Sequence, residues 1–151
     1  MPDYQVHLDA KVDRFVTEDD LIDFCTALEE RPGISAPVAG GGGESLGATV
    51  AVEAPDAWEA VTRAVAEFRA ALKEIGMHGR IVEIEVKDYD DFEVTVGEIA
   101  RDLGVSRERV RRWIRNPEYG FPSPVREEGS QKLWRWGDVR RWAEERGVLK
   151  K

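Results

Sequence analysis

Hydrophobic and polar residues alternate at the start of the chain. From Tyr4 to Val12 every second side chain is apolar, and polar residues lie between them. A period of two predicts a strand with one buried face. Thr17 then suits a helix N-cap, because three acidic residues follow it directly. The expected helix has one apolar stripe, formed by Leu21, Ile22, Phe24, Cys25 and Leu28.

The same alternation returns twice, on either side of a longer helical pattern. Residues 34–39 and 46–54 flank Gly40–Gly43 and predict a β-hairpin with a loose glycine turn. Asp56 caps the next helix, which ends at Gly76. Its expected apolar stripe consists of Trp58, Val61, Val65, Phe68, Leu72 and Ile75. Val82, Ile84 and Val86 then alternate with charged residues in a last strand.

The order of these elements is βαββαβ. Right-handed crossovers place such strands in one antiparallel sheet with both helices on one face, which is the ferredoxin-like arrangement. Pro37 lacks an N–H group, so the second strand is expected at an edge of the sheet. The other sheet face would be polar, and it is either solvated or a dimer or ligand surface. Its residues are Gln5, His7, Asp9, Lys11, Thr49, Glu53, Glu83, Glu85 and Lys87.

A second helical pattern begins at Thr95. Glu98 lies three residues later and completes a capping box, and Gly104 supplies a turn that accepts a positive φ. Ser106 caps a second helix with an inward stripe of Val110, Trp113 and Ile114. Two short strands around Glu-Glu-Gly-Ser at 127–130 predict a hairpin, or wing, and Val139, Trp142 and Ala143 predict a final packed helix. The pattern predicts a small winged helix-turn-helix.

Charge divides the chain into two parts of opposite sign. Residues 1–94 hold 8 Lys and Arg against 21 Asp and Glu, a net of −13, whereas residues 95–151 hold 14 against 9, a net of +5. We therefore expect an α+β protein with an acidic ferredoxin-like domain at 1–92 and a winged helix-turn-helix domain at 93–151.

Composition gives little support to other classes. A single cysteine excludes an intrachain disulfide, and neither a signal peptide nor a membrane span is evident, so a cytoplasmic protein is expected. The tetraglycine lacks the Lys-Ser/Thr of a phosphate-binding loop. His7 and His78 are expected to be solvated surface residues, and no catalytic, cofactor or metal site is predicted.

The second helix of this pattern concentrates basic residues. Arginine can bind guanine with two hydrogen bonds, glutamate can accept from cytosine, and other arginines can contact phosphates. Double-stranded DNA is therefore the expected partner. The expected contact residues on the helix and the wing are Ser106, Arg107, Glu108, Arg109, Arg111, Arg112, Arg115, Gln131 and Lys132.

Residues 95–147 also resemble a known family. The combination of Glu98-Ile99-Ala100, Leu103–Ser106, Gly120–Pro124 and Trp134–Val139 is similar to the winged helix-turn-helix of excisionase and AlpA-type proteins, relatives of the MerR regulators. The resemblance implies a DNA-binding regulator or a recombination directionality factor. Ser106, Arg107, Glu108, Arg111 and Arg112 would then begin the recognition helix, and Gln131 and Lys132 would lie in the wing. Unlike many family wings, this one carries Glu127 and Glu128.

The leading hypothesis is a sequence-specific transcription regulator that is not an enzyme. Its acidic domain would serve dimerisation, partner binding or sensing. Three alternatives are an excisionase-like recombination factor, an N-terminal ligand-binding or enzymatic unit tethered to DNA, and an adaptor without DNA binding.

Overall fold

The computed structural model describes residues 2–149, which divide into two compact units between Asp88 and Tyr89. Within this range the chain forms five α-helices and two antiparallel sheets, so the expected mixed α+β class is confirmed. The division lies slightly before the predicted boundary at 92, because Asp90 to Glu93 belong to the second unit. With that division, residues 1–88 carry a net charge of −10 and residues 89–151 a net charge of +2.

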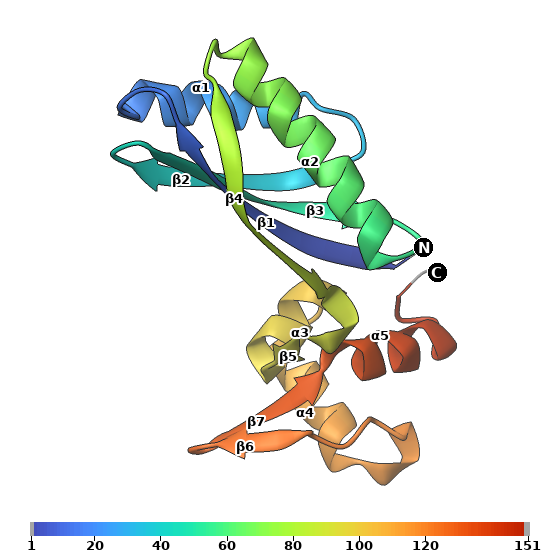
Figure 1. Ribbon diagram of the computed structural model, residues 1–151. Helices are drawn as coiled ribbons and strands as arrows, with labels where there is room; N and C mark the ends of the chain where they lie inside the picture. Colours follow the sequence, from blue (N-terminus) through green and yellow to red (C-terminus); the bar gives the residue numbers. More distant parts are fainter. Residues whose placement is uncertain (1, 150–151) are drawn as a thin grey trace. The chain divides into compact units, whose positions relative to one another are not determined.

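The first unit contains one four-stranded sheet and two helices (Figure 1). Its elements are β1 (Asp3–Val12), α1 (Glu18–Glu29), β2 (Ser35–Gly42), β3 (Ser45–Glu53), α2 (Ala57–Glu74) and β4 (Gly79–Asp88). The strands are antiparallel in the order β2-β3-β1-β4. Strand β2 lies at an edge of the sheet, as Pro37 predicted, and the expected βαββαβ order of elements is present.

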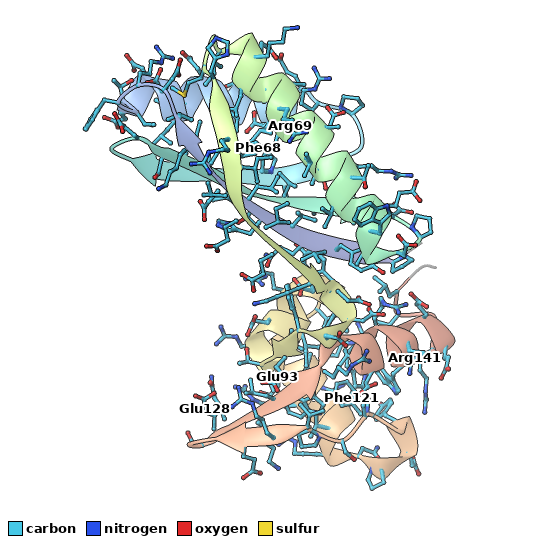
Figure 2. The ribbon with its side chains drawn as sticks, viewed as in Figure 1. Phe68, Arg69, Glu93, Phe121, Glu128 and Arg141 are labelled. Atoms are coloured by element: carbon cyan, nitrogen blue, oxygen red, sulfur yellow. The ribbon has the colours of Figure 1, made fainter. Side chains whose placement is uncertain are left out.

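The core of this unit lies between one face of the sheet and the two helices. The apolar residues of β1 from Tyr4 to Val12 are buried, as the alternation predicted. Phe24 of α1 meets Phe68 of α2 edge to face, with ring centroids 5.1 Å apart. Figure 2 shows Phe68 on the side of α2 that faces the sheet. Both helices therefore pack on the same core.

Two residues of the predicted helical stripes are exposed. Trp58 is 80% exposed and Ile22 is 58% exposed. Small residues occupy the buried face of α2 instead, namely Ala60, Ala64 and Ala71 beside Phe68 and Leu72. The sequence prediction placed the most hydrophobic side chains of α2 in the core. In the structure the helix packs closely on the sheet, and alanines fit most of the positions in that contact.

The glycine tract and the last strand also differ from expectation. Gly40 to Gly42 continue β2, so the turn is a tight one at Gly43 and Glu44 rather than a loose glycine loop. In β4 a bulge at Val82 breaks the register, and Ile81 takes the position opposite Ala10. Val82 and Ile84 are each 46% exposed, because β4 is an edge strand that the core covers only in part.

The second unit contains a three-stranded sheet and three α-helices. Its elements are the 3₁₀ turn η1 (Tyr89–Asp91), β5 (Glu93–Val94), α3 (Val96–Leu103), α4 (Arg107–Arg115), the 3₁₀ turn η2 (Pro117–Tyr119), β6 (Arg126–Glu128), β7 (Gln131–Arg135) and α5 (Trp136–Glu145). The strand order is β5-β7-β6. Strand β5 was not predicted, since two residues are too short to show an alternation. In residues 2–149 no helix is long and apolar enough to cross a membrane.

The two aromatic residues of α2 give a direct test of this packing. Phe68→Ala should destabilise the first unit by about 3–5 kcal/mol, because it leaves a cavity at the contact with Phe24. Trp58→Ala should change the stability by less than about 0.5 kcal/mol, because the side chain is exposed. Urea unfolding followed by far-UV circular dichroism measures both values. Equal effects of the two substitutions would contradict the observed orientation of α2.

Candidate functional site

Local capping residues fix where α3 begins and ends and where α4 begins. The Thr95 hydroxyl accepts a hydrogen bond from the Glu98 backbone N–H at 3.3 Å, and the Glu98 carboxylate accepts one from the Thr95 N–H at 3.2 Å. Gly104 ends α3 with a φ of +67°, which favours glycine. The Ser106 hydroxyl then accepts a hydrogen bond from the Arg109 N–H at 3.1 Å and begins α4. The sequence predicted each of these caps.

An aromatic cluster holds α4 against the hairpin of β6 and β7. Trp113 of α4, Trp134 of β7 and Trp142 of α5 surround Phe121, and their ring centroids lie 6.5, 6.0 and 4.9 Å from that of Phe121. The indole N–H of Trp134 donates to the carbonyl oxygen of Pro122 at 2.9 Å. Figure 2 labels Phe121, which is partly buried against the core of the unit, and Glu128 near the hairpin tip.

A groove of about 440 Å³ lies between the beginning of α3, the outer face of α4 and the hairpin. The residues that line it are Thr95, Val96, Gly97, Arg107, Arg111, Ile114, Arg115, Ser130, Gln131, Lys132 and Trp134. Five of the nine predicted contact residues are among them, namely Arg107, Arg111, Arg115, Gln131 and Lys132. These five residues define the basic groove.

The acids beside the basic groove are few and exposed. Glu108 pairs with Arg111 at 3.4 Å and with Arg115 at 3.0 Å. Lys132 lies 3.9 Å from Glu127 across the hairpin. Exposed pairs of this kind are weak and are screened by salt, so an anion of higher charge density can replace them.

The other predicted contact residues are exposed but do not line the groove. The Ser106 hydroxyl is used as a helix cap, and Glu108 pairs with its own helix. The Arg109 guanidinium lies 5.4 Å from the centre of the Trp113 ring. Arg112 is exposed on α4. The prediction treated the whole outer surface of α4 as one site. In the structure the hairpin lies beside only one side of α4, and only the residues on that side line the groove.

Gly97 is a groove residue that sequence reasoning missed. A Cβ atom at this position would lie 3.2 Å from a terminal nitrogen of the Arg107 guanidinium. The absence of a side chain therefore leaves room for Arg107 to lie across the first turn of α3. The signal that could have identified it is a glycine in the first turn of a capped helix, where glycine is unfavourable unless another group packs closely against the backbone.

The acidic segment at the start of the unit pairs with arginines outside α4. Asp90 accepts two hydrogen bonds from Arg140 of α5, at 2.9 and 2.8 Å. Asp91 pairs with Arg135 at 2.9 Å, and Glu93 pairs with Arg126 at 2.6 Å. This segment directly follows the division between the two units, and it neutralises basic residues of the sheet and α5.

These pairs shift the ionisation of their members. Hydrogen bonds from Arg140 hold the pKa of the Asp90 carboxyl below its usual value. Hydrogen bonds to Asp90 and Glu144 raise the pKa of Arg140, and the bond to Asp91 raises that of Arg135. The arginines on this part of the unit are therefore compensated by acids, and they do not line the basic groove.

Comparisons with known proteins give little guidance. No family model matches the chain. No curated protein is significantly similar to it. Two solved structures that match over 97% of the chain are the aminopeptidase PepT of Bacillus cereus ATCC 10987, at 11% identity and a TM-score of 0.34, and a tripeptidase of Staphylococcus aureus subsp. aureus Mu50, at 13% identity and a TM-score of 0.33. The chain spans about half the length of each.

These comparisons correct the function expected from the sequence. Neither peptidase is a DNA-binding regulator, so the similarities found do not fit a sequence-specific transcription regulator or a recombination directionality factor. The TM-scores are also too low to transfer the fold or the activity of a peptidase to this chain.

The pairing of Asp90 with Arg140 predicts an acid-sensitive second unit. Because its pKa is lowered in the folded state, Asp90 stabilises the fold fully above the ordinary carboxyl pKa of about 4, and this contribution is lost as the pH falls below that value. In Asp90→Asn the stability at neutral pH should decrease and the loss on acidification should become smaller. Urea unfolding at neutral and acidic pH, followed by tryptophan fluorescence in a Trp58→Phe background, measures both effects.

Asp102→Asn is the matched control, because Asp102 is an exposed acid of the same unit that lies 3.4 Å from its neighbour Arg101. It should lose as much stability on acidification as the unsubstituted chain. An acid response of Asp90→Asn that equals that of Asp102→Asn would contradict the role given to Asp90.

Proposed function

We propose that the second unit binds the phosphate backbone of double-stranded DNA in the basic groove. The observation that carries this proposal is the convergence of Arg107, Arg111, Arg115 and Lys132 on one groove, while acids compensate the arginines of β6, β7 and α5.

The spacing of the arginines favours a polymer over a small anion. Arg107, Arg111 and Arg115 are four residues apart on α4, so they form one row about 12 Å long. A single phosphate or carboxylate group reaches only one or two of these side chains. A DNA strand carries a phosphate every ~3.4 Å along the helix axis and can contact the whole row.

Two further features support a duplex. The major groove of B-DNA is about 12 Å wide and admits a helix such as α4, whereas the major groove of duplex RNA is too narrow. The order of α3, a glycine turn, α4 and the hairpin of β6 and β7 also agrees with the proposed resemblance to excisionase and AlpA-type winged helix-turn-helix domains. The hairpin would lie beside the strand that α4 contacts.

The first unit differs from the second in fold and in charge. Its strand order β2-β3-β1-β4 supports a ferredoxin-like arrangement. Its net charge of −10 repels phosphates, so it would remain away from the duplex and offer a surface to a second copy or another protein. We propose a binding protein rather than an enzyme, because the two units divide the charge between them, and we propose a location in the cytoplasm.

The arginine row provides the first test. Arg107→Ala, Arg111→Ala and Arg115→Ala should each weaken binding to all duplex sequences alike and reduce the slope of log affinity against log salt by about one unit. Fluorescence anisotropy with short labelled duplexes over a salt series measures affinity and slope. Arg141→Ala is the matched control, since this exposed arginine lies on α5 and does not line the groove.

Arg141→Ala should leave both quantities unchanged. Absence of salt-dependent binding by the unsubstituted chain would contradict the proposal, and so would an effect of Arg141→Ala equal to that of the groove variants. Tighter binding to duplex RNA than to duplex DNA would contradict the choice of DNA.

Glu108 provides a test in the opposite direction. Glu108→Gln removes the carboxylate that pairs with Arg111 and Arg115, so both arginines become available to phosphates and a nearby negative charge is lost. Binding to duplexes of any sequence should become tighter, most clearly at low salt. Glu145→Gln removes the same charge from the exposed end of α5 and should have no effect. Weaker binding by Glu108→Gln would mean that Glu108 itself contacts the DNA.

A further inference from the structure

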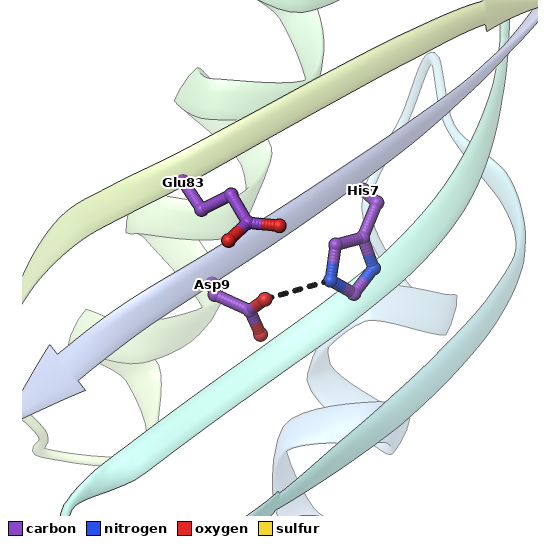
Figure 3. Close-up of side chains that lie close together, drawn as sticks. All are labelled: His7, Asp9 and Glu83. Atoms are coloured by element: carbon purple, nitrogen blue, oxygen red, sulfur yellow. Dashed lines mark hydrogen bonds and ion pairs between the residues drawn. The ribbon is translucent and has the colours of Figure 1, made fainter.

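The polar face of the first sheet carries a cluster of one histidine and two carboxylates. His7 and Asp9 lie on β1, and Glu83 lies on the neighbouring strand β4 (Figure 3). One ligand atom from each residue lies within 4.8 Å of the other two. His7 Nε2 and Asp9 Oδ2 are 2.8 Å apart. Figure 3 shows all three side chains directed toward one point above the sheet.

This convergence follows from the strand register. His7 and Asp9 are two residues apart, so both project from the face opposite the buried residues of β1. Glu83 is the residue of β4 directly opposite Asp9. The bulge at Val82 adjoins this pair, and bulges are frequent beside functional sites because they redirect side chains.

Two carboxylates in this position need a positive partner. Like charges directly opposite each other on adjacent strands are destabilising. Lys87, the closest lysine along β4, pairs with Glu85 at 3.1 Å rather than with Glu83. The unit as a whole has a net charge of −10, so it attracts cations to this face.

Two neighbours on β3 hold the cluster in place, and neither is an acid. His7 Nε2 lies 2.8 Å from Asp9 Oδ2, and because a carboxylate only accepts, Nε2–H donates to Asp9 when no ion is bound. The Thr49 hydroxyl lies 2.8 Å from Nδ1, so once zinc replaces the Nε2 hydrogen, Nδ1–H would donate to Thr49. Metal-binding histidines are commonly oriented by such a hydrogen bond from the other ring nitrogen. Gly47 faces Asp9, and a Cβ atom there would lie 2.1 Å from Asp9 Oδ1. Only glycine at this position leaves room for the Asp9 carboxylate.

We propose that His7 Nε2, Asp9 and Glu83 form a binding site for Zn²⁺. An imidazole nitrogen with two carboxylates suits zinc, whereas Mg²⁺ and Ca²⁺ prefer oxygen ligands alone. Ligand atoms on one zinc ion lie about 2.0–2.2 Å from it and thus no more than about 4 Å apart. Glu83 is exposed, so a rotation of its side chain closes the remaining distance. Three protein ligands leave a coordination position for water or an anion.

This site lies in the first unit and does not depend on the proposed DNA binding. It also revises the expectation that His7 is only a solvated residue and that the chain has no metal site. The sequence contained the His-x-Asp pair, but only the pairing of β1 with β4 brings Glu83 to it.

The test is calorimetric titration of Zn²⁺ into the full-length chain after treatment with a chelator. We expect one bound ion per chain in the unsubstituted protein. His7→Gln and Glu83→Gln should abolish measurable binding, while Thr49→Val should weaken it on the order of 10- to 100-fold. Circular dichroism checks that each variant is folded, and Glu83→Gln is the variant least disruptive to the sheet.

Matched controls are His78→Gln, Glu85→Gln and Cys25→Ser. They remove the other histidine, the next outward-facing acid of β4 and the chain's single cysteine, and each should bind zinc as the unsubstituted chain does. In ¹⁵N spectra of the histidine side chains, zinc should shift His7 Nε2 and leave the hydrogen on Nδ1.

The proposal is overturned if the unsubstituted chain takes up no zinc, or if His7→Gln and Glu83→Gln bind it as tightly as the controls. Coordination through His7 Nδ1 would overturn the role of Thr49. Equal affinity for Ca²⁺ and Zn²⁺ would overturn the choice of metal.

Discussion

The position of one aromatic ring determines the architecture of the second unit. Phe121 contacts Trp113 of α4, Trp134 of β7 and Trp142 of α5, so a single side chain joins two helices and the hairpin. The indole N–H groups of Trp134 and Trp142 donate to the carbonyl oxygens of Pro122 and Tyr119, which fixes the segment that carries Phe121. The groove exists because this cluster holds α4 and β7 at a set separation, with their basic side chains directed outward.

The net charge of this unit does not show where its positive charge is concentrated, because that depends on which arginines are paired with acids. The unit has a net charge of only +2, yet its cationic side chains are not equivalent. Arg126, Arg135 and Arg140 each hold an acid from the segment Asp90 to Glu93, whereas Arg111 and Arg115 of the groove share the single carboxylate of Glu108. A modest net charge is therefore compatible with a strongly basic groove, and the acidic segment makes this separation possible.

The first unit shows a different use of charged residues. One face of its sheet is covered by α1 and α2 and consists of apolar side chains, and the other carries titratable groups in register across three strands. A β-sheet aligns residues that are far apart in sequence, so a histidine, two carboxylates, a hydroxyl and a glycine from β1, β3 and β4 meet at one point. The two units thus carry separate candidate sites of opposite chemistry, one for a polyanion and one for a cation.

The sequence by itself determined the local features of this protein, because they depend on residues a few positions apart. It predicted the buried face of β1, the caps at Thr17, Thr95 and Ser106, the left-handed turn at Gly104 and the buried positions Val110 and Trp113. Tertiary structure decided the features that depend on distant neighbours. Packing on the sheet exposed Trp58 and buried Ala60 and Ala64, and pairing with β7 created the short strand β5. The basic groove and the cluster of His7, Asp9 and Glu83 likewise combine residues from different elements, and no periodicity along the chain encodes which of them come together.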